Sequence, residues 1–211
     1  MTLKVLLADD HAVMREGLAS LLAAAGMEVI GTAGNGREAV RMARELMPDV
    51  VVMDISMPDL NGVEAARELR ARAPSVRVVM LSMHASREHV HQALAAGAAG
   101  YVLKEAAATE VVTAVRAVAA GRRYLSPAME SAMLEAGGST ARGPLESLST
   151  RERQVLQLVV EGKSSAEIAR TVNLSPKTVE TYRSRLMKKL GVADVTALVK
   201  FAVQHGLTPP G

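Results

Sequence analysis

Short apolar segments alternate with amphipathic segments through the first 120 residues, and this alternation restricts the possible folds more than any other feature. The apolar segments are rich in valine, leucine and isoleucine, as strands buried on both faces of a parallel sheet are. The segments between them place apolar residues at helical spacing. The pattern predicts an α/β doubly wound, five-stranded parallel sheet with right-handed crossovers. The predicted strands are Leu3–Ala8, Glu28–Ala33, Val50–Met53, Val76–Leu81 and Gly100–Leu103.

Polar residues follow four of these strands. Asp9 and Asp10 come after the first strand, and Asp54 comes after the third. Ser82 and Lys104 come after the fourth and fifth strands. Ligands of open parallel sheets bind beyond the carboxyl ends of the strands, where the strand order reverses. If the order is 2-1-3-4-5, the three carboxylates converge in one cleft.

Clustered carboxylates repel one another unless a cation neutralises them. Mg²⁺ suits oxygen ligands and keeps several waters. With Lys104 and Ser82 beside one carboxylate, such a cleft could hold a phosphoryl group and offset the charge of its non-bridging oxygens during transfer. Simple solvation is the alternative for any single residue, but five polar residues at consistent strand ends favour a site.

Three motifs at these strand ends closely resemble the receiver domain of two-component response regulators. They are Val5–His11, Val51–Gly62 and Gly97–Lys104, and the second is highly specific in its order and spacing. The resemblance implies a flavodoxin-like receiver whose Asp54 accepts a phosphoryl group from a sensor histidine kinase.

The same resemblance implies a Mg²⁺ cofactor and a conformational switch. Lys104 would pair with the phosphoryl group, Ser82 would move toward it, and Tyr101 would turn inward as the readout. The implied ligands of Mg²⁺ are Asp9, Asp10, Asp54 and the backbone carbonyl of Ser56.

Charge is divided unevenly along the chain. From residue 141 onward there are 11 lysines and arginines against 6 aspartates and glutamates, whereas the preceding residues have 14 against 16. A basic segment suits a polyanionic partner. Proline, glycine and serine interrupt the pattern between the two parts, which predicts a linker with a short helix at 127–135. We therefore expect a receiver at 1–122, a linker at 123–147 and a second domain at 148–211.

The second domain is expected to be a small all-α, four-helix helix-turn-helix domain. Its predicted N-terminal caps are Ser149, Ser164 or Ser165, Ser175 and Asp194, and Gly191 ends the third helix. On that helix Val179, Leu186 and Leu190 share a stripe that would pack inward. The opposite stripe could enter a major groove. It carries Lys177, Glu180, Thr181, Ser184 and Lys188.

Leu148–Gly162 and Glu167–Val192 resemble the LuxR-type DNA-binding domain. Together with the receiver, this is the combination found in NarL/FixJ-type response regulators. It implies a transcriptional regulator of a bacterial two-component system, in which phosphorylation shifts domain arrangement and dimerisation to control promoter binding. The family suggests that Glu180, Thr181 and Ser184 face bases. The other implied contacts, to phosphates, are Lys177, Thr178, Arg183, Lys188 and Tyr182, which stands where histidine is commoner.

The family also implies the partners. They are a sensor histidine kinase, double-stranded promoter DNA and a second copy of the chain on activation, with RNA polymerase as a further candidate. The sequence has no apolar run long enough to cross a membrane and no signal-peptide pattern, so we expect no membrane partner and a cytoplasmic protein. The lack of cysteine excludes disulfides and thiolate metal sites.

Two alternatives stay open. A metal-dependent phosphohydrolase or phosphotransferase would need a substrate pocket and a general acid beside Asp54, and no motif supplies that acid. We therefore expect a regulator rather than an enzyme. A regulator independent of phosphorylation would use the first domain only for dimerisation or ligand sensing. The complete set of acids, serine and lysine argues against it.

Overall fold

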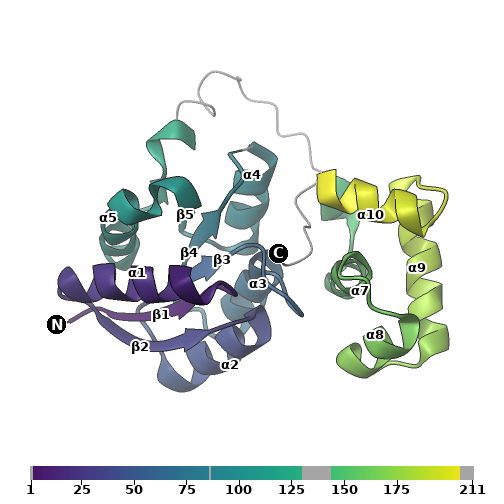
Figure 1. Ribbon diagram of the computed structural model, residues 1–211, viewed down its shortest axis with the longest axis horizontal. Helices are drawn as coiled ribbons and strands as arrows, with labels where there is room; N and C mark the ends of the chain where they lie inside the picture. The colour runs from purple at the N-terminus through teal and green to yellow at the C-terminus, as the bar shows by residue number, and fades with distance from the viewer. Residues whose placement is uncertain (1, 86, 130–143, 205–211) are drawn as a thin grey trace.

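The structure is a computed structural model that describes residues 2–85, 87–129 and 144–204. An α/β domain is followed by a helical domain (Figure 1). The strands run in the order β2-β1-β3-β4-β5-β6, and every neighbouring pair is parallel. They are β1 (Lys4–Ala8), β2 (Glu28–Ala33), β3 (Val50–Asp54), β4 (Arg77–Ser82), β5 (Gly100–Leu103) and β6 (Tyr124–Leu125).

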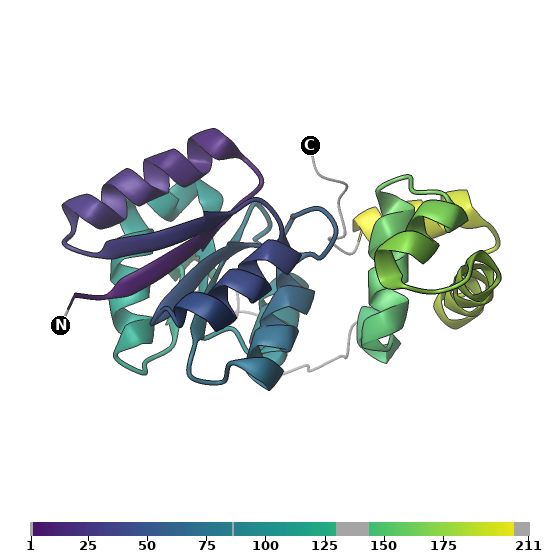
Figure 2. The ribbon, with the colours of Figure 1, turned by 90° about the horizontal axis from the view of Figure 1, so that it is seen from below.

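Helices cover both faces of this sheet, as Figure 2 shows. On β1, Val5 and Leu7 belong to one apolar core, whereas Leu6 and Ala8 belong to the other. Side chains alternate across a strand, so a strand covered on both faces reads as continuously apolar. The doubly wound fold and the order of its first five strands are confirmed. One face is covered by α1 (Ala12–Ala24) and α5 (Ala107–Ala119), and the other by α2 (Gly36–Leu46), α3 (Gly62–Arg72) and α4 (Arg87–Ala96).

The expected number of five strands is wrong, because β6 adds a sixth at the sheet edge. The backbone N–H of Tyr124 donates to Ala99 O (3.1 Å), and that of Ser126 donates to Tyr101 O (2.9 Å). Two residues are too few to produce a periodic pattern, and they fall in the segment expected to begin the linker. The chain is helical at 127–129, and the rest of the short helix expected at 127–135 lies outside the described residues.

The C-terminal domain has the four predicted helices. They are α7 (Thr150–Val160), α8 (Ser165–Val172), α9 (Pro176–Leu190) and α10 (Val195–Gln204), and short 3-10 turns lie at η1 (Lys104–Ala106) and η2 (Pro144–Ser147). Ser149 and Ser164 each form a capping box, and Ser175 accepts a hydrogen bond from the N–H of Thr178. Asp194 accepts one from the N–H of Ala197 (2.8 Å). The predicted caps are confirmed, with Ser164 rather than Ser165 before α8.

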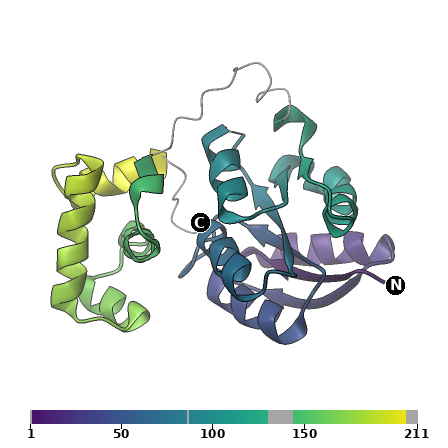
Figure 3. The same ribbon diagram turned by 180° about the vertical axis from the view of Figure 1, so that it is seen from behind.

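Helix α7 lies between the α/β domain and α9, as Figures 1 and 3 both show. Leu156 of α7, Ile168 of α8 and Leu186 of α9 are fully buried in one core. Within the described residues, no helix combines the length and apolarity needed to cross a bilayer.

Candidate functional site

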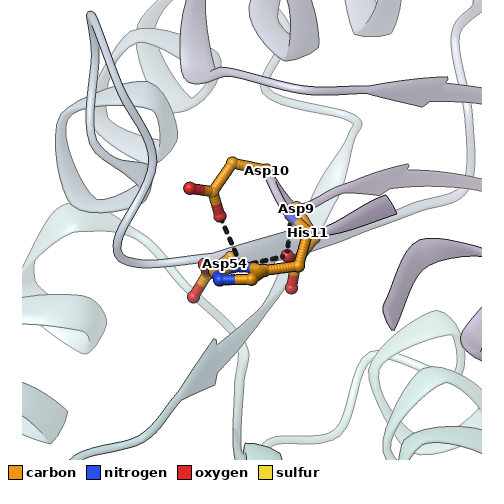
Figure 4. Close-up of side chains that lie close together, drawn as sticks. All are labelled: Asp9, Asp10, His11 and Asp54. Atoms are coloured by element: carbon orange, nitrogen blue, oxygen red, sulfur yellow. Dashed lines mark hydrogen bonds and ion pairs between the residues drawn. The ribbon is translucent and has the colours of Figure 1, made fainter. Parts of the chain in front are cut away.

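The carboxyl ends of β1 and β3 lie side by side, because Ala8 pairs with Met53 in the parallel register. Asp9 and Asp10 therefore meet Asp54 at one edge of the sheet. Ligand atoms from these three carboxylates and from His11 all lie within 4.8 Å of one another (Figure 4). Asp9 and Asp54 are almost completely buried. The structure thus brings together the acids that the sequence predicts to form one cleft.

Lys104 reaches into this cleft from the end of β5. Its Nζ lies 2.8 Å from Asp9 Oδ2 and 2.8 Å from Asp54 Oδ2. Burial alone would lower the pKa of Lys104, but the negative charges of Asp54 and Asp9 outweigh it and raise that pKa. The lysine is therefore cationic and neutralises only part of the charge of the three carboxylates.

Burial raises the pKa of Asp54 above its ordinary value. The charge of Lys104 and a backbone hydrogen bond from Ser56 oppose this shift, whereas the charge of Asp9 adds to it. The ionised carboxylate is thus held at a cost in the isolated chain. A ligand that adds positive charge here would offset that cost.

The residues present fit Mg²⁺. One buried oxygen of each acid, Asp9 Oδ2, Asp10 Oδ1 and Asp54 Oδ2, accepts no well-oriented hydrogen bond from the described residues. The contacts of these three oxygens are with Lys104 Nζ and His11 Nδ1. Carboxylate oxygens are hard donors of the kind Mg²⁺ prefers. The fit depends on this donor set and on the crowding of negative charge within it.

His11 belongs to the cluster, although no role was predicted for it from the sequence. Its Nδ1 lies 2.8 Å from Asp10 Oδ1 and 3.2 Å from Asp9 Oδ1. Its backbone N–H also donates to Asp9 Oδ1 (2.8 Å). The sequence feature that could have identified His11 is its position directly after two acids at the end of a strand.

Ser82 and Tyr101 both hold the chain that follows β4. The N–H of His84 donates to Ser82 Oγ (3.0 Å), and the Tyr101 hydroxyl donates to His84 O (2.7 Å). Tyr101 is fully buried, and burial raises its pKa to about 12 against a smaller opposing effect of the Ser82 hydroxyl. A movement of Ser82 would therefore disturb the contact that fixes Tyr101.

Gly62 brings the start of α3 against the backbone of Asp54. A Cβ at this position would lie 2.1 Å from Asp54 O, far inside van der Waals contact. Glycine thus allows the β3–α3 loop, residues 55–61, to fold tightly beside the acidic cleft.

The β3–α3 loop and α3 contact α7 of the second domain, and we call these contacts the domain junction. Glu64 Oε1 lies 2.6 Å from Arg153 Nε. Asn61 Nδ2 donates to Gln157 Oε1 (3.3 Å). Asp59 N–H donates to Glu161 Oε1 (3.2 Å).

The domain junction was not predicted from the sequence. The signal in the sequence was that Arg153, Gln157 and Glu161 recur every four residues, which places the first two on one face of α7 and the third at its C-terminal cap on the same side. Burial raises the pKa of Glu64, and the guanidinium groups of Arg67 and Arg153 oppose that shift.

Helix α9 exposes the stripe expected to meet DNA. Val179 and Leu186 are fully buried, so the predicted inward stripe is confirmed at these two positions. Thr178 and Tyr182 are half-buried, and Arg183 lies against Ser165 and Glu180. The five residues predicted to form that stripe are all exposed, namely Lys177, Glu180, Thr181, Ser184 and Lys188.

Comparison with known families gives two matches. Residues 5–116 match the response regulator receiver domain, and residues 146–202 match the bacterial regulatory proteins of the luxR family. The chain belongs to the response regulators that join a receiver to a LuxR-type DNA-binding domain. It is a DNA-binding transcriptional regulator of a two-component system.

Individual relatives match over almost the whole chain. The transcriptional regulatory protein MctR of Rhizobium johnstonii is 40% identical over 97% of this chain and 95% of its own. The response regulator UvrY of Escherichia coli is 38% identical with the same coverage. The structure of RcsB from Salmonella typhimurium is 26% identical over 96% of this chain and 98% of that one, with a TM-score of 0.60. RcsB is also among the similar structures as a DNA complex.

Proposed function

We propose that Asp54 is the phosphoacceptor of this regulator and that its phosphorylation controls binding to promoter DNA. The observation that carries the proposal is the position of Lys104 Nζ, 2.8 Å from both Asp54 and Asp9 in a buried acidic cleft. A lysine held there by two carboxylates is placed to pair with a phosphoryl oxygen once Asp54 has reacted.

In the proposed transfer, an Oδ of Asp54 attacks the phosphorus of a phosphohistidine in a sensor histidine kinase. The P–N bond breaks, and the imidazole nitrogen keeps the bonding electron pair. Mg²⁺, held by Asp9, Asp10, Asp54 and the carbonyl of Ser56, would supply positive charge to the phosphoryl oxygens. Lys104, at the end of β5, supplies the chain's own positive charge.

An apolar groove beside the cleft suits the kinase. It has a volume of about 600 Å³ and is lined largely by α1, Met83 and the start of α5. Val13 is 85% exposed and Met83 is 73% exposed, which is unusual for apolar side chains of this size. A helix of the kinase that covers them would bring its histidine to the adjacent Asp54.

We propose two routes from Asp54 to the second domain. One passes through Ser82 to the chain at His84 and so to Tyr101. The other is the β3–α3 loop, which begins directly after Asp54 and carries Asp59 and Asn61 to the domain junction. Phosphorylation would act by favouring one of two domain arrangements.

The proposed DNA surface is the exposed stripe of α9. Lys177, Lys188 and the hydroxyls of Thr178 and Tyr182 would contact phosphates, and Thr181 and Ser184 would face bases. A related structure contains RcsB dimers bound to DNA, which supports both promoter DNA and a second copy of the chain as partners. Because promoter DNA lies in the bacterial cytoplasm, we place the protein there.

The test is the intact mass of the full chain after incubation with Mg²⁺ and acetyl phosphate, with D54A in parallel. We expect one phosphoryl adduct on the wild type and none on D54A. The same samples, passed over a sizing column and titrated with promoter DNA, should show a change in size or affinity only where the adduct forms. An adduct that survives in D54A would contradict the assignment of Asp54, and equal DNA affinity with and without the adduct would contradict control by phosphorylation.

A further inference from the structure

We propose that Glu180 recognises a cytosine in each operator half-site, and that Arg183 and Ser165 are the positioning residues for this contact. The inference rests on the proposed DNA contact of α9. Three side chains meet beside the exposed stripe of α9, one from α8 and two from α9. Arg183 Nη1 donates to Ser165 Oγ (2.7 Å) and lies 3.2 Å from Glu180 Oε1, and the Ser165 hydroxyl also donates to Glu180 Oε1.

The contacts fix one oxygen of Glu180 and leave the other available. Every contact that Glu180 makes with the described residues uses Oε1. The Glu180 side chain is 60% exposed, whereas that of Arg183 is only 20% exposed. The carboxylate is thus accessible on the stripe expected to meet DNA, while its partner lies beneath it.

The chemistry of a carboxylate selects among base edges. A carboxylate only accepts hydrogen bonds. In the major groove, cytosine presents its N4 amino donor, whereas guanine presents two acceptors and thymine one acceptor. Adenine has an amino donor, but its N7 acceptor lies beside that donor and suits an amide rather than a carboxylate. Oε2 of Glu180 therefore favours cytosine.

Electrostatics explains why the positioning residues are needed. A lone carboxylate brought between two phosphate backbones is repelled by their negative charge. Arg183 places a positive charge in contact with the carboxylate, and its hydrogen bond to Ser165 holds that charge on α8. Because Arg183 is half-buried and committed to these contacts, it serves Glu180 rather than a phosphate.

The neighbouring residues make the prediction specific. Thr181 and Ser184 carry hydroxyls, which both donate and accept and so discriminate weakly between bases. Glu180 is the acceptor-only side chain among these three base-facing candidates. The strongest base preference due to α9 should therefore be a cytosine at one position of each half-site, favoured about tenfold over other bases.

The test is selection of binding sites from random double-stranded DNA by the full chain, with and without acetyl phosphate. The wild type should select one cytosine position per half-site. E180Q should convert that position from cytosine to a purine, because the amide Nε2 that replaces Oε2 donates to N7, an acceptor that adenine and guanine both present in the major groove. Since this variant gains a new preference, a folding defect cannot produce the result.

The positioning role is tested with R183A and R183K. R183A should lose the cytosine preference while the other positions of the selected site persist, and R183K should restore part of it. K188A is the matched control for a residue that binds phosphate. It should weaken binding to all sites alike and flatten the salt dependence by about 0.9 log units per decade for each phosphate that the variant leaves without a cation.

The outcomes separate the two proposals. A wild type that selects a site without this cytosine, or an E180Q that keeps the cytosine, would overturn the role of Glu180 while the DNA-binding surface stands. An unchanged preference in R183A would overturn the positioning role. If the wild type selects no site and K188A binds as the wild type does, the DNA-contacting role of α9 fails as well.

Discussion

Nε of Arg153 on α7 lies 2.6 Å from Oε1 of Glu64 on α3, so an ion pair between two largely buried side chains joins the two domains. Glu64 sits in the first turn of α3, whose N-terminal cap is Asn61. Asn61 also bonds to Gln157 of α7. The helix that starts beside the proposed phosphoacceptor is therefore the helix that holds the DNA-binding domain.

The domain junction involves α7 and leaves α9 on the far side of that helix (Figure 3). Regulation through this contact would act on the placement of the DNA-binding domain, and hence on how two copies meet a repeated half-site. It would not require the receiver to cover the exposed stripe of α9.

Breaking the ion pair should loosen the domain junction. In E64A, Arg153 loses its buried partner, and in R153A, Glu64 loses one of its two cations. We expect each variant to enlarge the radius of gyration measured by small-angle X-ray scattering. Because the two residues contact each other, the free energies of unfolding in a double-mutant cycle should be non-additive by about 0.5–3 kcal/mol. Additive effects would show that the pair does not couple the domains.

Removing the charge of Asp54 should stabilise the receiver in the absence of Mg²⁺. Because the pKa of Asp54 is raised in the folded state, folding favours the protonated form. The stabilisation that this raised pKa contributes is fully present below the ordinary pKa of aspartate. It is lost as the pH rises through the pKa that Asp54 has in the folded protein. We expect the thermal midpoint of D54N to exceed that of the wild type by a few degrees at pH 7, with the difference shrinking toward pH 4. A difference that grows as pH falls would contradict the direction of the shift.

Lys104 and Mg²⁺ should compete for the same negative charge. In K104A, Asp9 and Asp54 lose the cation that lies 2.8 Å from each, so the metal-free variant should melt below the wild type. Mg²⁺ should then raise the midpoint of K104A more than that of the wild type, because the vacated charge strengthens metal binding. K163A, at an exposed lysine, is the control and should respond to Mg²⁺ as the wild type does. An equal Mg²⁺ response in K104A and the wild type would contradict competition.

Two glycines should respond to alanine in opposite directions. In G62A the new methyl group would meet Asp54 O at 2.1 Å, so the backbone must shift at a cost of about 1–3 kcal/mol. In G17A, inside α1, nothing lies within 4 Å of the new methyl group, and stability should increase by up to about 1 kcal/mol. Chemical denaturation of both variants measures the contrast. A neutral G62A would mean that the β3–α3 loop can relax away from Asp54.

Local pattern accounts for the parts of the fold that the sequence predicted. The inner strands were predictable because they are buried on both faces and therefore continuously apolar, as in β1 and β3. The helix starts at Ser149 and Ser175 were predictable because a cap satisfies backbone groups within three residues of itself. The acidic cleft followed from the rule that parallel strands end at the same edge of a sheet.

Long-range contacts account for the parts that the sequence did not predict. Strand β6 has two residues and is defined only by its pairing with β5. The Glu64–Arg153 pair joins residues of different domains, and neither residue lies in a motif that predicts its partner. The sequence predicts Arg183 as a phosphate contact of α9, whereas its hydrogen bond to Ser165 of α8 forms only when the two helices pack together.

Patterns between near neighbours in the chain were therefore enough to define the two domain classes and the position of the acidic cleft, because periodicity and capping act over a few residues. The domain junction and the pairing of Glu180 with Arg183 and Ser165 arise only when separately formed helices pack together. Packing brings together residues that lie far apart in the chain, and no local pattern encodes those contacts.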